Sequence, residues 1–248
     1  MTKRKIRGSV ALVTGANRGL GRALTEELLS RGVKKLYATA RDPQTLRDLR
    51  DERIVVLRLD VTDADQVRTA IEAASDVEIV FSNAGAALGT SIIGPRALEH
   101  AQHEMDVNYF GPLRLLQRLA PTLARNGGGA VVNVGSVAGL SNVPFLPTYA
   151  ASKAALHSLT QAARMLLSAQ GTSVFGVYPG PIDTDMSRAL AIPKTAARDV
   201  AITILDGVEA GQEDIFPDLY AAEFGRSFEA SPKALEQQIA AMMLATAA

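Results

Sequence analysis

Two side chains that can exchange a proton with a substrate stand four residues apart, at Tyr149 and Lys153. The Ala-rich, Leu-spaced sequence that follows them to about Gln170 predicts a helix, so both project from one face as neighbours. A phenol is a poor acid near neutral pH because its ordinary pKa is about 10. A nearby ammonium favours the phenolate, and we therefore expect Lys153 to lower the pKa of Tyr149 toward the working range.

The pair taken alone is also typical of a tyrosine at the edge of a core beside a solvated lysine. Three further features of the sequence favour chemistry. Ser136 stands thirteen residues before Tyr149, Asn108 lies further upstream, and a glycine-rich turn begins at Gly15. These features together indicate catalysis more specifically than a tyrosine and a lysine at helical spacing do.

Together these residues resemble the short-chain dehydrogenase/reductase family, and the resemblance covers about Val10 to Met186. It implies an NADP-preferring carbonyl reductase in which Tyr149 gives or takes the proton at the substrate oxygen and Ser136 orients that oxygen. It also implies that Lys153 holds the nicotinamide ribose and tunes Tyr149. Asn108, through its backbone, would help to hold a water-linked proton path to the lysine.

The glycine-rich turn lies between an expected strand, Ser9 to Thr14, and an expected helix, Leu20 to Ser30. Glycines at such a turn let the backbone approach a pyrophosphate, which the N–H groups of the helix start then face. The turn matches the family's pattern Thr-Gly-x-x-x-Gly-x-Gly. The resemblance assigns cofactor contacts here to Gly15, Asn17, Arg18, Gly19, Leu20 and Gly21.

The end of the second expected strand, Lys35 to Ala40, bears on the choice of cofactor. Folds that bind NAD place an acid there, which accepts hydrogen bonds from the adenosine ribose. Here Arg41 follows the strand, and Arg41 and Arg18 would meet a 2′-phosphate, so we predict NADP(H). If the strand ended two residues later, Asp42 would become the ribose acid and NAD would be preferred.

Further cofactor contacts are expected beyond the next two strands. Ile54 to Leu59 is rich in Ile, Val and Leu, as in a strand buried on both faces, and Asp60 and Val61 follow it. The resemblance places Asp60 at the adenine, whereas the alternative is an acid that caps a turn. After the fourth strand, Val77 to Phe81, the segment Ser82-Asn83-Ala84-Gly85 resembles the family's Asn-Asn-Ala-Gly. The remaining contacts that the resemblance implies are Asn83, Ala84, Gly85, Tyr149, Lys153, Pro179, Gly180, Ile182 and Thr184.

Ser136 follows the fifth expected strand, Ala130 to Val134, at the end where ligands bind in open α/β sheets. No Gly-x-Ser-x-Gly elbow surrounds it, which counts against hydrolase chemistry. The other expected elements are helices at Pro43 to about Asp51, after Pro95 to about Arg125 with an interruption near Gly111-Pro112, and Pro232 to Leu244, and a strand at Ser173 to Tyr178.

Six or seven strands alternating with helices predict an α/β fold. We expect a single-domain, Rossmann-type, doubly wound parallel sheet of about seven strands with helices on both faces. The domain spans residues 1–248, with a flexible N-terminus over about 1–8 and a C-terminal substrate-side or interface segment over about 218–248. The resemblance weakens there, because many relatives end with a further strand, and we expect Glu213 to Asp218 to replace it.

The composition bounds the class of protein. The chain has 248 residues, 47% of them hydrophobic, zero net charge and no cysteine, so disulfides and Cys-based metal sites are impossible. The apolar run Val10 to Val13 is too short for a signal-peptide core or a membrane span. We expect a cytoplasmic protein with a small carbonyl or alcohol substrate and no nucleic-acid or membrane partner. No metal is expected, because His100, His103 and His157 lack the spacing of a metal site.

The function predicted from the sequence is NADPH-dependent reduction of a ketone or aldehyde. One alternative is an alcohol- or sugar-oxidising dehydrogenase that works in the opposite direction. Another is an NADPH-binding regulatory protein without turnover, which need not keep the four residues Asn108, Ser136, Tyr149 and Lys153. The segment between Gly180 and the next helix near Thr195 is short, which leaves the pocket mouth open unless the segment around Tyr220 to Phe228 folds over it. An open mouth favours bulky, apolar substrates.

Assembly is expected to involve the helix from Tyr149 to Gln170. This helix has more small side chains than one buried stripe needs, so a second helix can approach it closely. We therefore predict a homodimer packed through this helix and the preceding one. A tetramer is also compatible with the sequence. The alternative is that the alanines reflect helix propensity. The alanines concerned are Ala150, Ala151, Ala154, Ala155, Ala162 and Ala163.

Overall fold

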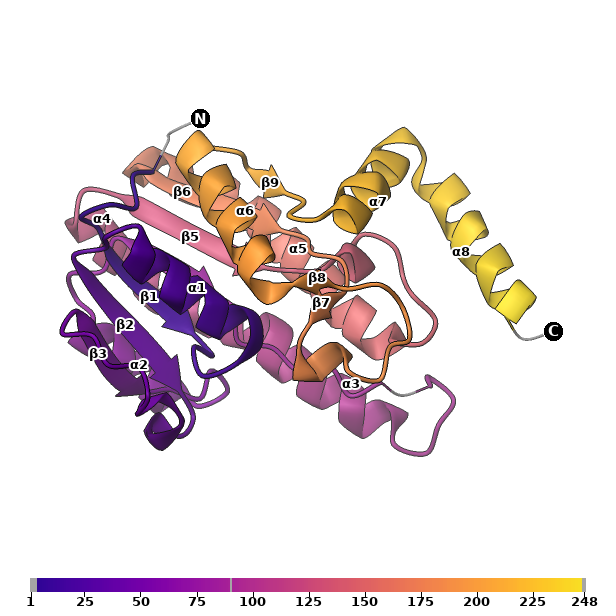
Figure 1. The fold of residues 1–248 in the computed structure, drawn as a ribbon, viewed down its shortest axis with the longest axis horizontal. Coiled ribbons are helices and arrows are strands. Elements are labelled where there is room, and N and C mark those ends of the chain that lie inside the picture. The colour runs from indigo at the N-terminus through magenta and orange to yellow at the C-terminus, as the bar shows by residue number, and fades with distance from the viewer. Residues whose placement is uncertain (1–3, 90, 247–248) are drawn as a thin grey trace.

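The structure, a computed structural model, describes residues 4–89 and 91–246, and within them seven parallel strands form one sheet (Figure 1). The strand order is β3-β2-β1-β4-β5-β6-β9. From β1 the chain adds β2 and β3 toward one edge of the sheet, and then adds β4, β5, β6 and β9 toward the other edge. The point between β1 and β4, where the order of addition switches, is where dinucleotides bind in doubly wound folds. The predicted single-domain Rossmann-type fold is confirmed. The strands are β1 (Val10–Thr14), β2 (Lys35–Ala40), β3 (Ile54–Arg58), β4 (Ile79–Ser82), β5 (Gly129–Val134), β6 (Thr172–Val177) and β9 (Asp214–Ile215).

Helices cover both faces of the sheet. The first layer contains α1 and α6, and the second contains α2, α4 and α5 (Figure 1). The helices are α1 (Gly19–Ser30), α2 (Ala64–Ala73), α3 (Ala97–Met105), α4 (Gly111–Arg125), α5 (Pro147–Leu167), α6 (Ala197–Ala210), α7 (Leu219–Ala230) and α8 (Pro232–Thr246). Shorter elements are the turns η1 (Pro43–Leu46), η3 (Val137–Gly139), η4 (Ser168–Gln170) and η5 (Asp185–Ser187), the π-helical segment η2 (Asp106–Phe110), and the paired strands β7 (Ile182–Asp183) and β8 (Thr195–Ala196).

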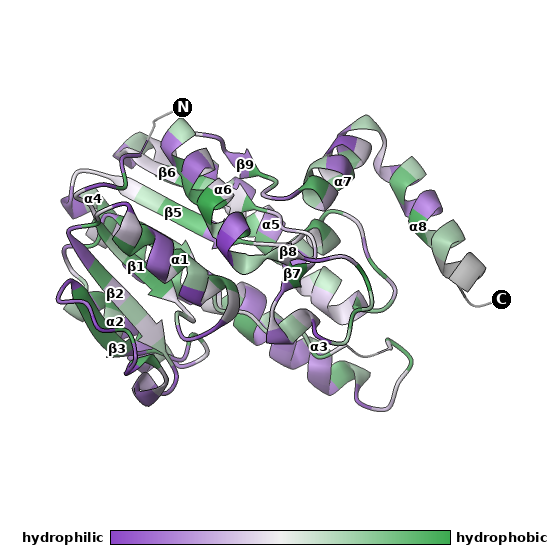
Figure 2. Cartoon of the chain, in the orientation of Figure 1, coloured by the Kyte–Doolittle hydropathy of each residue, from purple (hydrophilic) through white to green (hydrophobic). Residues whose placement is uncertain are grey.

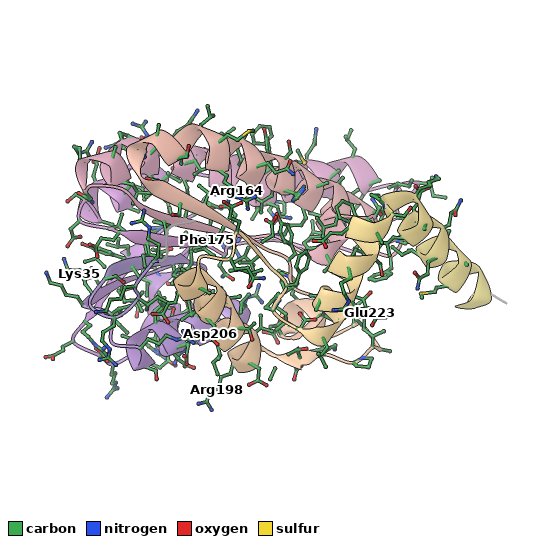
Figure 3. The ribbon with its side chains drawn as sticks, turned by 90° about the horizontal axis from the view of Figure 1, so that it is seen from above. Lys35, Arg164, Phe175, Arg198, Asp206 and Glu223 are labelled. Carbon is green, nitrogen blue, oxygen red and sulfur yellow. The ribbon has the colours of Figure 1, made fainter. Side chains whose placement is uncertain are left out.

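The core lies between the sheet and each helical layer. Leu24 of α1 and Ile204 of α6 are fully buried against one face, and Leu119 of α4 packs against the other. Figure 2 shows β5 mainly hydrophobic, whereas α6 carries both hydrophilic and hydrophobic turns, as expected for a helix with one exposed side. In the view from above, Phe175 of β6 lies in the interior and Arg198 points outward (Figure 3).

The prediction that the third strand is buried on both faces is wrong. β3 forms the edge of the sheet and pairs with β2 alone among the described residues. Val55 and Val56 are therefore 37% and 38% exposed. The apolar run indicates a strand, but its position at the edge depends on the order of the whole sheet.

The helix expected from Pro43 to about Asp51 is also wrong in its length. The structure has one 3-10 turn, Pro43–Leu46, capped by Asp42, whose carboxylate accepts a hydrogen bond from the backbone N–H of Gln44. Arg53 then pairs with Asp51 and donates to the carbonyl oxygen of Leu29. These contacts direct the chain into β3 before a longer helix forms.

The long helix expected to end at about Arg125 is interrupted, as predicted, just before Pro112. Residues Asp106–Phe110 form a π-helical segment between α3 and α4. Gly111 fits there because an added Cβ would lie 2.8 Å from Cγ2 of Val61. Irregular turns of this kind are frequent at functional sites.

The C-terminal part of the chain differs from the expectation. The segment Glu213 to Asp218 does not replace the additional strand, because Asp214–Ile215 pairs with β6 as β9. The helix α7, which follows Asp218, packs against Val137 and Tyr178 through Phe224. Leu235 of α8 joins this cluster and Ile239 packs against it, while the end of α8 extends away from the sheet (Figure 1).

Across the described ranges, 4–89 and 91–246, none of the helices combines the length and the apolar character required to cross a lipid bilayer.

Candidate active site

Asn108 lies in the π-helical segment and is completely buried. Its side chain holds the chain just after β4, because Oδ1 accepts from the N–H of Ala86 at 2.9 Å and Nδ2 donates to the oxygen of Ala86 at 2.8 Å. Nδ2 also donates to Oγ of Ser152 on α5 at 2.8 Å. The side chain of Asn108 thus joins three segments, whereas the family resemblance of the sequence implied a role for its backbone.

Lys153 projects from α5 toward the same point. The residue is 4% exposed, and Nζ donates to the carbonyl oxygen of Val134 at the end of β5, at 2.8 Å. An added Cβ at Gly85 would lie 3.2 Å from Oδ1 of Asn108 and 3.6 Å from Nζ of Lys153. Gly85 is therefore the point where the two side chains converge, and a larger residue there would crowd both.

Tyr149 stands one helical turn before Lys153, whose Nζ lies 5.7 Å from the centre of the phenol ring. Burial raises the pKa of Tyr149 to about 12, a hydrogen bond with Ser136 acts in the opposite direction, and the negative charge of Glu104 raises it further. Burial also lowers the pKa of Lys153 to about 8. The expectation that the pKa of Tyr149 falls toward the working range is therefore wrong in this structure, because the loss of solvation dominates.

Ser136 follows β5 and precedes the turn η3. Its Oγ accepts from the N–H of Ala138 at 3.2 Å, which leaves the hydroxyl hydrogen to donate toward Tyr149. Ser136 and Tyr149 thus face one another at the carboxyl end of the sheet.

The glycine-rich turn has the geometry expected for close approach of a phosphate group. Gly15 and Gly19 have φ values of +66° and +54°, which other residues rarely adopt. An added Cβ at Gly21 would lie 2.1 Å from the oxygen of Gly15, so α1 packs directly on the turn. Arg18 makes no side-chain cap at the start of α1, so the first N–H groups of this helix are available to a ligand.

Thr14, which the sequence analysis did not predict as a site residue, holds this turn to the end of β4. The hydroxyl of Thr14 accepts from the backbone N–H groups of Asn83 and Ala84, each at 2.9 Å. In return, Nδ2 of Asn83 donates to the oxygen of Thr14 at 2.9 Å. Asn83 thus ties two neighbouring strands together, and Thr14 is its partner.

The second strand ends at Ala40, as predicted, and the side chain of Arg41 is exposed beyond it. Asp42 is engaged as the cap of η1. Arg18, which is exposed at the start of α1, forms an ion pair with Asp185 at 3.8 Å.

Asp60 adopts the turn-capping arrangement that was the alternative to an adenine contact. Its Oδ1 accepts from the N–H of Thr62 at 2.9 Å and from the Thr62 hydroxyl at 2.7 Å. Val61 is buried and packs against Gly111.

The turn Pro179-Gly180-Pro181 is held by an acid, Asp218, that the sequence analysis did not identify as a site residue. Asp218 accepts from the N–H of Gly180 at 2.9 Å and from that of Ala221 at 2.8 Å, so one carboxylate fixes the turn and caps α7. Beyond Ile182, the methyl group of Thr184 lies 3.1 Å from the position of an added Cβ at Gly19. The turn after β6 therefore lies beside the glycine-rich turn.

Comparison with known proteins identifies the class. The family model for short chain dehydrogenases matches residues 9–194. The chain therefore belongs to the short-chain dehydrogenase/reductase family and is an oxidoreductase of that family.

Three relatives illustrate the similarity. The crystal structure of a short chain dehydrogenase from Burkholderia cenocepacia in complex with NADP is 37% identical, covers 95% of this chain and 99% of its own, and superposes with a TM-score of 0.91. An uncharacterized oxidoreductase of Staphylococcus epidermidis is 30% identical over 190 residues, which are 74% of this chain and 82% of the relative. Human 17-beta-hydroxysteroid dehydrogenase type 1 is 34% identical over 203 residues, covering 75% of this chain and 61% of the relative.

Proposed function

We propose that this protein reduces a ketone or aldehyde to an alcohol with NADPH. The observation that carries the proposal is the convergence of Asn108 and Lys153 on Gly85, with Tyr149 and Ser136 facing each other beside it. A binding protein without turnover has no need of a buried lysine next to a phenol, because burying an ammonium is costly.

The crevice suits a dinucleotide. Gly15 and Gly19 lack the side chains that would obstruct a pyrophosphate, and the start of α1 offers N–H groups to it. Lys153 would reach the nicotinamide ribose, and Thr184 would contact the nicotinamide amide. The other residues proposed to hold the cofactor are Asn17, Arg18, Leu20, Gly21, Arg41, Asp60, Val61, Asn83, Ala84, Gly85, Tyr149, Pro179, Gly180 and Ile182.

When bound, the reduced cofactor supplies a hydride to the carbonyl carbon. Tyr149 donates its phenolic proton to the carbonyl oxygen as the charge on that oxygen grows. The hydroxyl of Ser136 donates a hydrogen bond to the same oxygen and thereby orients it. Lys153 stabilises the resulting phenolate by its charge, and Asn108 keeps the surrounding backbone in place.

The protonation state of Tyr149 fits the role proposed for it in carbonyl reduction. With a pKa of about 12, the phenol retains its proton at neutral pH. A protonated Tyr149 is ready to donate, as carbonyl reduction requires, whereas alcohol oxidation requires a base at this position.

Preference for NADPH is proposed from the end of β2. The strand ends at Ala40, Arg41 is exposed next to it, and Asp42 is occupied as a cap. The Burkholderia cenocepacia relative was crystallised with NADP, whereas a relative from Burkholderia phymatum, 25% identical with a TM-score of 0.80, was crystallised with NAD. The two guanidinium groups of Arg18 and Arg41 favour the cofactor with the 2′-phosphate.

A bulky, apolar carbonyl compound is the proposed substrate class. A groove of about 540 Å³ lies between α3, α5 and the loops that follow β4 and β5, and its lining includes Ile92, Met105 and Pro144. Leu88 and Phe145 in the same loops are 42% and 46% exposed. Apolar walls of this kind bind apolar ligands, and one similar protein is a human hydroxysteroid dehydrogenase.

The test is a panel of aryl ketones, aldehydes, sugars and alcohols with purified protein, followed by the change in NADPH absorbance. We expect turnover of aryl ketones with NADPH. Turnover of alcohols or sugars alone would favour the opposite direction, and binding of NADPH without any turnover would favour the regulatory protein.

A further inference from the structure

A buried acid lies one helical turn before Asn108. Glu104 of α3 is completely inaccessible to solvent, and its Oε1 accepts from the backbone N–H of Leu88 at 2.7 Å. Asn108 holds Ala86 through both its N–H and its oxygen. Residues four apart share one face of a helix, so Glu104 and Asn108 together fix two alternate residues of the segment 86–88.

The segment 86–88 crosses the site. At its start, Gly85 lies against Nζ of Lys153, and at its end an added Cβ on Gly89 would lie 3.7 Å from Cδ2 of Leu146. Leu146 packs in one cluster with Tyr149. The segment therefore runs between two positions next to the proposed proton donor, Lys153 at its start and the Leu146–Tyr149 cluster at its end.

Stability does not account for Glu104. Within the described part of the chain its Oε2 is buried without a hydrogen-bond partner, as is Nδ1 of His100 one turn earlier. A buried carboxylate with one backbone hydrogen bond is costly, and a leucine at this position would avoid the cost. Residues that break the rules for a stable core are expected at functional sites.

We propose that Glu104 is a positioning residue of the substrate site, which fixes the backbone of residues 86–88 together with Asn108. The inference rests on the proposed carbonyl reduction. Removal of the carboxylate releases Leu88 and lets the segment beside Tyr149 and Lys153 move, so the KM for the carbonyl substrate rises and kcat falls. The bond that is lost lies at Leu88, beyond the proposed cofactor contacts Asn83 to Gly85, so the Kd for NADPH should change less than the KM for the carbonyl substrate.

Two substitutions separate this role from a structural one. Glu104→Leu removes the acceptor, and we expect kcat/KM to fall by roughly 10–100-fold, the range for one lost hydrogen bond to a charged group. Its Tm stays at or above that of the wild type. Glu104→Gln keeps an acceptor for Leu88 and restores kcat/KM to within a few fold. Glu99, which is exposed on the same helix, provides the matched controls Glu99→Leu and Glu99→Gln.

Hydrogen exchange of the free protein gives a readout that does not need turnover. In Glu104→Leu the amides of residues 86–89 should exchange faster, whereas those of α5 should not change. If Glu104→Leu does not fold, Leu88→Pro removes the N–H donor instead, with Leu88→Ala as its control, and Leu88→Pro should show the same loss of kcat/KM.

A wild-type protein without carbonyl turnover contradicts the proposed function, and hydrogen exchange then decides the role of Glu104. Unchanged exchange in Glu104→Leu, or activity within twofold of the wild type, would overturn the proposal, as would a loss of activity with a lower Tm that Glu104→Gln does not restore.

Discussion

Lys153 directs its ammonium group to the carbonyl oxygen of Val134, 2.8 Å away, while the same nitrogen lies 5.7 Å from the centre of the Tyr149 ring. The lysine is thus held by the end of β5 and not by the phenol hydroxyl. Because both side chains lose solvation, the pKa of Tyr149 is raised to about 12 and that of Lys153 is lowered to about 8. Tyr149 is therefore a phenol at neutral pH, and the proton it carries is the one that we propose it donates.

The first prediction concerns this proton. Tyr149→Phe keeps the ring and its packing but removes the dissociable proton, so kcat should fall by roughly 10²–10⁴. Steady-state kinetics with NADPH and a reactive ketone, together with fluorescence titration of NADPH, measure turnover and binding separately. NADPH should still bind. Tyr37→Phe, which removes a tyrosine hydroxyl that contacts Asp76, serves as the control and should retain turnover. Near-normal turnover by Tyr149→Phe would remove Tyr149 as the proton donor.

The second prediction concerns the dependence of stability on pH. The pKa of Lys153 falls from its usual 10.5 to about 8 in the folded protein, so between these values the unfolded chain binds more protons than the folded chain. Stability contributed by this residue therefore rises with pH through that window. Relative to Lys153→Met, the wild type should gain about 2 kcal/mol of unfolding free energy from pH 8 to 10.

Urea denaturation of both proteins at several pH values gives this difference, and the comparison cancels the titration of exposed lysines. The titration of Tyr149 contributes to the pH dependence of both proteins alike. A difference that is constant from pH 8 to 10, or that falls, would show that Lys153 titrates normally in the folded state.

The sequence predicted the strands and the glycine-rich turn well because their signals are local. Apolar runs of four to six residues bounded by glycine or a charge are sufficient to indicate β1, β2 and β5. The exposure of Val55 and Val56 was not predictable in this way, because it depends on the position of β3 at the sheet edge.

The residues that the sequence analysis missed act through distant partners. Asp218 resembles an ordinary loop acid until the fold brings it to the N–H of Gly180. Glu104 resembles a solvated acid on a helix, although its spacing of four residues from Asn108 places it on the same face. A buried acid is recognised only when the packing of α3 on α5 is known.

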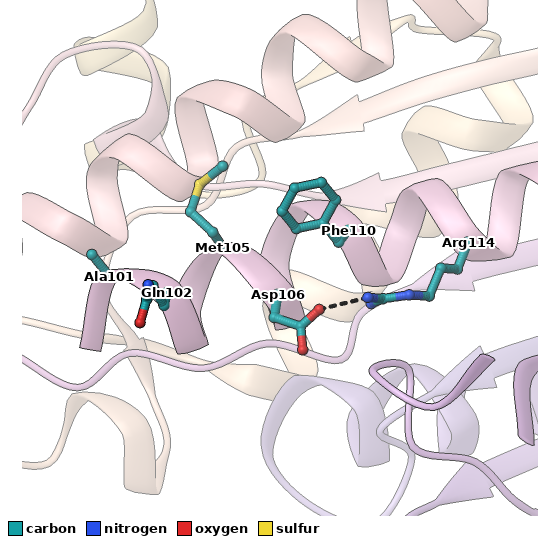
Figure 4. A pocket seen from close by; sticks show the side chains of 6 residues that line it. All are labelled: Ala101, Gln102, Met105, Asp106, Phe110 and Arg114. Atoms are coloured by element: carbon teal, nitrogen blue, oxygen red, sulfur yellow. Dashed lines mark ion pairs between the residues drawn. The ribbon is translucent and has the colours of Figure 1, made fainter. Parts of the chain in front are cut away.

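The third prediction is a homodimer packed through α5 and α4. The exposed side of α5 consists of small residues such as Ala151 and Ala154 and ends in Met165, which is 72% exposed. Beside it, a hollow of about 580 Å³ is lined by Phe110, Met105 and the ion pair of Asp106 with Arg114 (Figure 4). Small residues next to exposed apolar ones let a second pair of helices approach closely.

Light scattering at micromolar concentration should give twice the chain mass. Ala154→Arg should give a monomer, because a long charged side chain prevents the close approach. Ala73→Arg, on the exposed side of α2, should leave the mass unchanged. A wild-type monomer would show that the alanines reflect helix propensity.

The fourth prediction concerns the substrate. Ile92 lines the groove beside the site and is 67% exposed, whereas its neighbour Ile93 is 91% exposed and does not line that groove. Burial of an apolar ligand against Ile92 contributes roughly 1 kcal/mol or more, so Ile92→Ser should raise the KM for an aryl ketone several-fold. Ile93→Ser should not. Activity confined to small polar sugars or hydroxy acids would contradict the apolar substrate class.

The fifth prediction concerns the cofactor. Arg41 is exposed at the end of β2, and Arg18 is held by an exposed ion pair with Asp185, which is weak and easily exchanged for a phosphate. Hydrogen bonds to charged groups contribute about 1.5–3 kcal/mol each, so two arginines favour NADPH over NADH by roughly 10²–10⁴ in kcat/KM. Screening at an exposed rim favours the lower half of this range, and added salt should reduce the preference.

Arg41→Ala should lower the ratio of kcat/KM for NADPH over NADH by roughly tenfold or more, mainly through a higher KM for NADPH. Arg47→Ala removes an exposed arginine just beyond η1 and should leave the ratio unchanged, because Arg47 lies outside the pair proposed to meet the phosphate. The wild-type preference is tested by steady-state kinetics with both cofactors at saturating ketone. Equal or better use of NADH would contradict the assignment of Arg18 and Arg41 to the 2′-phosphate, since Asp42 would then be the group that selects the cofactor.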